Sequence, residues 1–106
     1  MPYLISTMWY PSHMQNEIVK KFLKITKNYP AKDDIYIQLC APIVATKEGI
    51  KCMTIREVKK GKFEEAMTYT TKFYNEFMNI EGYEYQIEVW HTFEEAIAIG
   101  GIVMPE

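Results

Sequence analysis

Residues 35–58 read IYIQLCAPIVATKEGIKCMTIREV and contain two apolar, β-branched runs, Ile35–Thr46 and Ile50–Val58. Two such runs on either side of a short polar segment predict two antiparallel strands joined by a hairpin. The joining segment is Lys47–Gly49, and Gly49 can adopt the positive φ that hairpin loops favour. The rest of the chain is therefore expected to assemble around this hairpin.

The register of the hairpin decides which side chains share a face of the sheet. A three-residue loop pairs Ala41 with Ile55, which makes one face apolar and leaves the other mixed. We expect helices to cover the apolar face, which consists of Ile37, Leu39, Ala41, Ile55, Ile87 and Val89. The mixed face then carries Tyr36, Gln38, Cys40, Arg56, Gln86, Glu88 and Trp90. A face of this kind suits packing on a second sheet around a small cavity.

The segment before the hairpin predicts one strand and one helix. Tyr3–Tyr10 is rich in β-branched and aromatic residues and is followed by Pro11, so it is predicted as the first strand. Ser12 and Gln15 have the spacing of a capping box, and apolar residues recur after them at helical intervals. This first helix is expected to end at Asn28–Pro30.

The segment after the hairpin predicts a helix, a strand and a short final helix. Phe63–Asn79 carries a broad apolar stripe at helical spacing, which we expect to form core rather than a cofactor site. Tyr83–His91 alternates apolar with polar residues and is predicted as the fourth strand. Thr92 and Glu95 form a second capping box, and the short helix that they begin is expected to end at Gly100–Gly101.

The resulting order of elements, βαββαβ, predicts an α+β fold of the ferredoxin-like type. Two helices would share one face of a four-stranded antiparallel sheet whose first and third strands are central, and a short C-terminal helix would follow. The length of 106 residues fits one domain, residues 1–106.

Composition argues against several classes of partner and location. Twelve Lys and Arg against fourteen Asp and Glu give a net charge of -2, so the chain lacks the positive field that attracts nucleic acid. No apolar run reaches the ~18 residues needed to cross a bilayer, and the first residues do not resemble a secretion signal. Cys40 and Cys52 form neither a disulfide framework nor a CxxC motif, which indicates a reducing, cytoplasmic location.

Two short segments carry a resemblance to a known superfamily. The chain opens with a strand that reads STMWYP at residues 6–11, continues past His13 into a helix, and closes with VWHTFEEAI at residues 89–97. In these features and in its order of elements it resembles small uncharacterised members of the dimeric α/β-barrel superfamily. The resemblance implies a homodimer joined through the sheet face, with a small organic ligand between sheet and helices. Members include metal-independent monooxygenases, haem-degrading enzymes and muconolactone isomerases, so the fold does not choose the reaction.

His13 and Arg56 have the strongest chemical reasons for a functional role. His13 lies where the first strand meets the first helix, and its imidazole is either an exposed first-turn side chain or a general base near neutral pH. Arg56 lies on a central strand and needs a partner for its charge, either Glu57 or Glu88 within the fold or a ligand carboxylate. The expected ligand-binding residues are Tyr10, Tyr36, Gln38, Arg56, Glu88 and Trp90. The aromatic residues among them either line a pocket or pack in the dimer interface.

Three kinds of function follow from these features. The first is a cofactor-free monooxygenase or isomerase with His13 as base and Arg56 as anion anchor. The second is a non-catalytic dimerisation or binding module. The third comes from the opening Met1-Pro2, which is similar to the tautomerase superfamily, where a free N-terminal proline is the general base, and Pro2 would be that base. No residues at metal or haem spacing accompany the histidines, so no metal or cofactor is expected.

Overall fold

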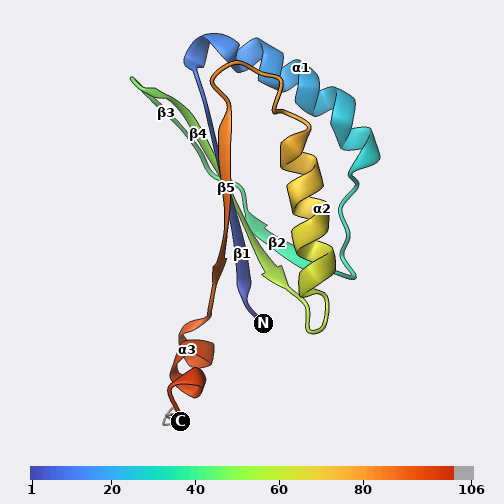
Figure 1. Cartoon of the computed structure of the whole chain (residues 1–106), viewed down its shortest axis with the longest axis vertical. Coiled ribbons are helices and arrows are strands. Elements are labelled where there is room, and N and C mark those ends of the chain that lie inside the picture. Colours follow the sequence, from blue (N-terminus) through green and yellow to red (C-terminus); the bar gives the residue numbers. More distant parts are fainter. Residues whose placement is uncertain (102–106) are drawn as a thin grey trace.

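The computed structural model describes residues 1–101 and shows an α+β fold in which two helices cover one face of an open antiparallel sheet (Figure 1). The helices are α1 (Gln15–Ile25), α2 (Phe63–Asn75) and α3 (Phe93–Ile99). The strands are β1 (Tyr3–Tyr10), β2 (Tyr36–Cys40), β3 (Ile43–Thr46), β4 (Gly49–Val58) and β5 (Glu84–Trp90). Their order is β2-β4-β1-β5, with β3 also paired to β4, which is compatible with a ferredoxin-like fold. Residues 102–106 of the predicted domain lie outside the described residues.

Strand β1 has the predicted bounds and joins the two buried clusters of the molecule. It pairs antiparallel with both β4 and β5, so Leu4 lies between Arg56 and Val89. Leu4 belongs to one cluster at the start of the strand, and Tyr10 belongs to the other at its end. The helix-facing row between the clusters contains the polar side chains of Ser6 and Thr54, and Arg56 lies in the adjoining row beside Leu4. The sheet therefore has a polar middle between two apolar ends.

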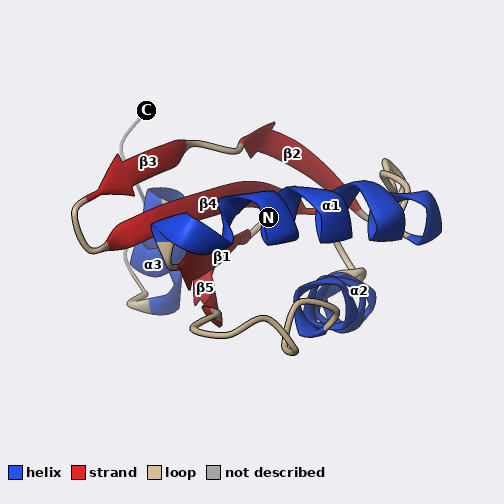
Figure 2. Cartoon of the chain, turned by 90° about the horizontal axis from the view of Figure 1, so that it is seen from above, coloured by secondary structure: helices blue, strands red, loops and turns tan. Residues whose placement is uncertain are grey.

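The prediction of Ile35–Thr46 as a single strand is wrong, because the structure divides this segment into β2 and β3 at Ala41 and Pro42. Proline has no N–H group to donate to the ladder and commonly interrupts a strand. The carbonyl of Pro42 still accepts a hydrogen bond of 2.9 Å from the backbone N–H of Met53. The sheet consequently has five strands rather than four, and β2 and β3 follow one another along the same side of β4 (Figure 2).

The predicted hairpin register is also wrong. Thr46 pairs with Gly49, so the loop has two residues rather than three. Cys40, rather than Ala41, pairs with Ile55, and the register shifts once more within β2. A shift of one residue moves side chains to the other face of a sheet, because successive side chains of a strand point in opposite directions.

Arg56 faces the helices instead of the open face, because the helices cover the opposite face of the hairpin from the one predicted. Arg56 pairs with Leu4 on one side and with Gln38 on the other, and paired residues share a face. Leu4 is fully buried under α2 together with Val58 and Tyr36. Arg56, Gln38 and Tyr36, all predicted on the open face, therefore lie on the helix side.

The open face receives apolar residues that were predicted to lie under the helices. Ile37 pairs with Glu57, and Ile55 pairs with Ile5, both on the face away from α1 and α2. Strand β5 agrees with the prediction, because Val89 pairs with the buried Leu4 on the helix side. The alternate residues of β5 point outward, namely Gln86, Glu88 and Trp90.

The predicted capping box at the start of the first helix is wrong. Helix α1 begins at Gln15 after a 3-10 turn at Ser12–Met14, without a side-chain cap. The side chain of Gln15 instead accepts a hydrogen bond of 2.5 Å from the hydroxyl of Tyr10. Helix α2 begins at Phe63 as predicted and ends at Asn75, four residues early. Within residues 1–101 no helix is both long and apolar enough to cross a bilayer.

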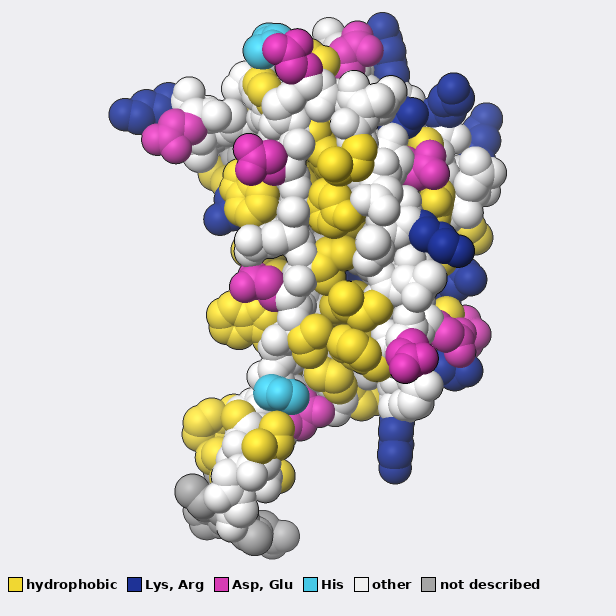
Figure 3. All heavy atoms as spheres, viewed as in Figure 1, with side chains coloured by type: hydrophobic (Ala, Val, Ile, Leu, Met, Phe, Trp, Pro, Cys, Tyr) yellow, Lys and Arg dark blue, Asp and Glu magenta, His cyan; other side chains and the backbone are white. Residues whose placement is uncertain are grey.

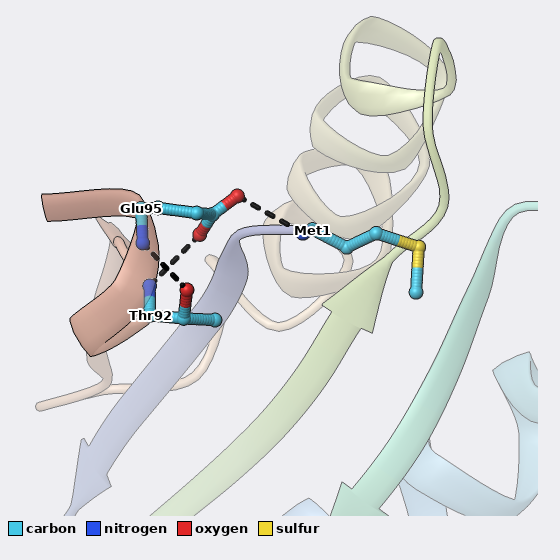
Figure 4. A network of polar contacts seen from close by, with 3 residues as sticks. All are labelled: Met1, Thr92 and Glu95. Carbon is cyan, nitrogen blue, oxygen red and sulfur yellow. Dashed lines mark hydrogen bonds and ion pairs between the residues drawn. The ribbon is translucent and has the colours of Figure 1, made fainter. Parts of the chain in front are cut away.

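The second capping box is confirmed and fixes the start of α3 (Figure 4). The Thr92 hydroxyl accepts from the Glu95 N–H at 3.1 Å, and the Glu95 carboxylate accepts from the Thr92 N–H at 2.8 Å. The other carboxylate oxygen pairs with the Met1 ammonium group at 2.9 Å. The backbone hydrogen bond and the ammonium group lower the pKa of Glu95. These contacts attach α3 to the start of β1, although the helix projects away from the sheet (Figure 1).

Ser6 is a buried polar residue in the middle row of the sheet. Its hydroxyl oxygen has no hydrogen-bond partner among residues 1–101. An unpaired buried hydroxyl costs about 1–3 kcal/mol. We therefore expect Ser6→Ala to raise the free energy of unfolding by about 1 kcal/mol in urea denaturation. The exposed Ser12→Ala is the control, and a loss of stability in Ser6→Ala would show that the hydroxyl is stabilised after all.

Candidate functional site

A cleft between the helices and the sheet brings polar and aromatic side chains together around Arg56. Its first part, called here the Arg56 chamber, has a volume of about 330 Å³. Strands β2 and β4 form its floor, and α1 and α2 contribute aromatic side chains to its walls. The lining residues used below are Phe22, Tyr36, Gln38, Thr54, Arg56, Tyr69, Phe73 and Tyr74.

The guanidinium group of Arg56 is held by three neutral neighbours. Its Nη1 donates to the Thr70 hydroxyl at 3.2 Å, and its Nε donates to the Gln38 side-chain oxygen at 3.4 Å. Its central carbon lies 4.2 Å from the centre of the Tyr36 ring, which is a cation–π distance. Thr70 and Tyr36 are themselves buried, so they give the guanidinium a fixed position.

The charge of Arg56 is not matched by a carboxylate within residues 1–101. The two ion pairs in this part of the chain join Met1 to Glu95 and Lys62 to Glu65. Glu57 and Glu88, the internal partners considered from the sequence, lie on the opposite face of the sheet. Asp33 is the acidic residue in the chamber lining, where it is exposed and forms no ion pair with Arg56. Because a guanidinium stays protonated, the chamber holds a fixed positive charge.

A second part of the cleft, called here the apolar chamber, has a volume of about 290 Å³. It lies nearer the end of β1 and is lined mainly by apolar side chains, including Met8, Ile18, Val19, Ile43, Cys52 and Phe77. Its lining shares five residues with that of the Arg56 chamber, namely Phe22, Ala41, Thr54, Phe73 and Tyr74. The two chambers are therefore neighbours along one cleft.

The polar groups of the apolar chamber are neutral and paired. Tyr10 donates to Gln15, and the hydroxyls of Thr54 and Tyr74 share a hydrogen bond of 3.1 Å. Burial raises the pKa of Tyr10 to about 12, which keeps its phenol protonated. Burial likewise raises the pKa of the Cys52 thiol. This chamber consequently offers an uncharged environment.

The aromatic stripe of α2 forms the wall between the cleft and the core. Phe73 packs edge to face against Phe22 of α1, with ring centres 6.2 Å apart, and against Phe77 at 5.5 Å. Phe77 is fully buried, as the prediction of a core stripe requires. The hydroxyl of Tyr69 donates to the Pro30 carbonyl, which holds its ring at the side of the Arg56 chamber.

The structure brings some of the predicted site residues together and separates others. Tyr36, Gln38 and Arg56 share the Arg56 chamber, whereas Tyr10 lies in the apolar chamber. Glu88 and Trp90 lie on the open face of the sheet, away from the cleft.

The two residues proposed as bases lie outside both chambers. His13 is exposed in the turn before α1, and the described lining of either chamber does not include it. Pro2 has its nitrogen in a peptide bond to Met1, and its carbonyl accepts from the Val58 N–H at 3.0 Å. Neither position places a basic nitrogen beside Arg56.

Thr70 is the partner of Arg56 that sequence reasoning did not identify. It lies inside the apolar stripe of α2 and is completely buried. A threonine in such a stripe is the one signal that could have revealed it, because a buried hydroxyl needs a hydrogen-bond partner.

A larger hollow of about 670 Å³ lies at the end of the sheet beside Gly49 and Gly82. The charged side chains around it, those of Glu48, Lys51 and Glu84, are all exposed to solvent. Exposed charges are strongly hydrated and bind ligands weakly. The helix–sheet cleft is therefore the better candidate site.

Within residues 1–101, no three His, Cys, Asp or Glu side chains are grouped in a way that would hold a metal ion. Comparison of the chain with protein-family models, with curated proteins and with solved structures found no match. The superfamily resemblance thus rests on the order of elements and the short segments already described.

Proposed function

We propose that this protein binds a small carboxylate-bearing molecule, preferably aromatic, in the helix–sheet cleft. The observation that carries the proposal is the Arg56 guanidinium, which faces a cavity and, among residues 1–101, is held by neutral partners. A guanidinium presents several N–H donors in a fixed plane, and this geometry matches the two oxygens of a carboxylate. Binding of such an anion supplies the missing opposite charge.

The walls of the chamber explain the preference for an aromatic body. The rings of Tyr36, Tyr69 and Phe73 line the same cavity as Arg56. Aromatic rings stack or pack edge to face with a planar ligand and favour it beyond the area that it buries.

Calorimetric titration with benzoate tests this proposal. Arg56→Met keeps most of the side-chain length but removes the charge, and we expect benzoate to bind about 10- to 100-fold more weakly, as for the loss of hydrogen bonds to a charged group. His13→Ala is the control, because His13 is exposed and lies outside the cleft lining. Equal benzoate affinity in Arg56→Met and the unchanged protein, with both folded by circular dichroism, would contradict the proposal.

We also propose that two copies associate through the open face of the sheet. Ile37, Val44 and Trp90 lie on this face and are 46%, 50% and 53% exposed. Apolar side chains alternate with acidic ones along the edge of this face that Figure 3 shows on the left. Ile5 and Ile55 pair with each other on the same face, and extensive exposed apolar surface is typical of protein interfaces.

The chain exposes more surface than a compact monomer of its length, in part because α3 projects away from the sheet. The radius of gyration is 15.9 Å, whereas a compact chain of this length has a value of about 13 Å. The accessible surface is 7283 Å², against roughly 6,200 Å² expected for a folded monomer of 12.5 kDa. The difference is comparable to the ~800 Å² that each partner buries in a standard interface.

Analytical ultracentrifugation tests the dimer. We expect the unchanged protein to sediment with twice the mass of one chain and Trp90→Glu to sediment as a monomer, because a carboxylate at this position would lose its hydration in the interface. Leu23→Glu is the matched control, since Leu23 is 61% exposed on α1, on the helix side. A monomeric unchanged protein would exclude the proposed dimer.

The proposal concerns binding and assigns no reaction to the cleft. A cofactor-free monooxygenase or isomerase would need a general base within hydrogen-bond reach of the ligand, and His13 lies outside the cleft lining. Both cysteines are free thiols, which supports the cytoplasmic location proposed from the sequence.

A further inference from the structure

The two chambers of the cleft differ in charge although they adjoin one another. The Arg56 chamber contains a fixed guanidinium, and the apolar chamber is lined by aliphatic, aromatic and neutral polar side chains. Thr54 and Tyr74 line both chambers, and their hydroxyls are hydrogen-bonded to each other where the chambers meet. The cleft is therefore charged at one end and apolar at the other.

The order of residues along β4 defines the direction in which the cleft changes from charged to apolar. Arg56, Thr54 and Cys52 alternate along the strand and face the helices. Arg56 and Cys52 are four residues apart, or roughly 13 Å along the strand. A ligand that contacts both must have its charge at one end and an apolar part at the other.

We propose that the ligand is a monocarboxylate with an apolar tail, such as a medium-chain fatty acid or an arylalkanoic acid. This inference rests on the proposed function. The carboxylate of the ligand binds Arg56, and its tail passes Thr54 and Tyr74 into the apolar chamber. A second carboxylate at the far end of the ligand would enter a chamber that is lined mainly by apolar side chains and contains no charged one. Dicarboxylates are therefore expected to bind less well than monocarboxylates of the same length.

A chain-length series of carboxylates tests the ligand class by calorimetry. Burial of one CH₂ group contributes about 0.8 kcal/mol, so affinity is expected to rise about fourfold per methylene from butanoate through hexanoate to octanoate. Arg56→Met should weaken every member of the series. The dicarboxylate suberate should bind more weakly than octanoate, which has the same number of carbon atoms.

The outcomes separate this inference from the proposed function. If benzoate and butanoate bind through Arg56 but affinity does not rise with chain length, the apolar chamber does not bind the ligand tail. The inference then fails, while the proposed function stands. If no carboxylate binds, both fail. If affinity rises with length but is unchanged in Arg56→Met, the tail binds without the anchor, and the inference fails as stated.

A variant that fills the apolar chamber adds a second test. Val19 lines this chamber only and is 42% exposed on α1, so a larger side chain can be introduced there without repacking the core. We expect Val19→Phe to lower octanoate affinity about tenfold or more, by excluding several methylenes, and to leave butanoate affinity unchanged. Leu23→Phe is the control on the exposed surface of the same helix. Equal losses for octanoate and butanoate would contradict a tail-specific chamber.

The two cysteines provide a measurement that does not depend on affinity. Cys52 lines the apolar chamber, whereas Cys40 is exposed on the open face. Alkylation followed by peptide mass spectrometry should show that saturating octanoate slows the modification of Cys52 severalfold and leaves Cys40 unchanged. Unchanged alkylation of Cys52 at saturation would place the tail elsewhere and overturn the inference.

Discussion

Phe77→Ala is expected to lower the free energy of unfolding by about 3–5 kcal/mol. Phe77 is fully buried in the cluster that joins α2 to Tyr10 and Tyr83, and its ring lies 5.6 Å from the Tyr83 ring. Truncation removes this buried ring and leaves a cavity that the neighbouring aromatic side chains fill only partly. Urea denaturation followed by circular dichroism measures the change.

Phe93→Ala is the matched control, because Phe93 is 67% exposed on the projecting helix α3. Surface substitutions of this kind usually change stability by less than about 0.5 kcal/mol. Similar losses in the two variants would contradict the placement of Phe77 in the core. The size of the expected effect is a large part of the stability of a domain of this length.

Gly49→Ala is expected to lower the free energy of unfolding by about 2–4 kcal/mol, because two unfavourable effects combine. Gly49 follows the β3–β4 turn with a φ of 135°, a conformation that residues with a Cβ rarely adopt. A Cβ at this position would also lie 2.7 Å from the carbonyl oxygen of Tyr10. The backbone cannot move away without disturbing the pairing of β4 with β1.

Gly61→Ala separates the two effects. Gly61 also has a positive φ, 77°, but a Cβ there would meet no atom within 4 Å. Only the backbone cost of about 1–2 kcal/mol should remain. Equal losses in Gly49→Ala and Gly61→Ala, measured by the same denaturation experiment, would show that the contact with Tyr10 carries no cost.

Local sequence signals predicted the elements whose ends are set by neighbouring residues. The first strand has its predicted bounds, Tyr3–Tyr10, because Pro11 terminates a run of β-branched and aromatic residues. The capping box of Thr92 and Glu95 is also confirmed, since both side chains are free to bond the backbone. The same motif at Ser12 and Gln15 failed because Tyr10, a residue outside the motif, binds the glutamine.

The faces of the hairpin could not be obtained from alternation alone. Between residues 35 and 40 alternation selects Ile35, Ile37 and Leu39 as the buried set, yet Ile37 and Leu39 are exposed and Tyr36 is buried. The choice is made by tertiary contacts, because Leu4 and Val58 are fully buried under α2 and fix the orientation of β4. Arg56 lies two residues from Val58 on β4, so its side chain is on the same face and points toward the helices.

The residue types of the candidate site were easier to predict than their grouping. Arg56 was identified because a charged residue on a central strand needs a partner, and Tyr36 and Gln38 because they were predicted on the same face of the sheet; the structure gathers all three in one chamber. Trp90 was grouped with them only through the wrong hairpin face. Thr70 lies fourteen residues from Arg56 in the chain, and only the packing of α2 on β4 reveals their contact.

A crystal structure of the protein grown with benzoate tests the central claim most directly. We predict that the benzoate carboxylate lies about 2.7–2.9 Å from the guanidinium nitrogens of Arg56, with its ring among Tyr36, Tyr69 and Phe73. The account is contradicted if Arg56 is paired with a carboxylate of the protein, such as that of Asp33, while the cleft is filled by side chains and benzoate lies elsewhere or is absent.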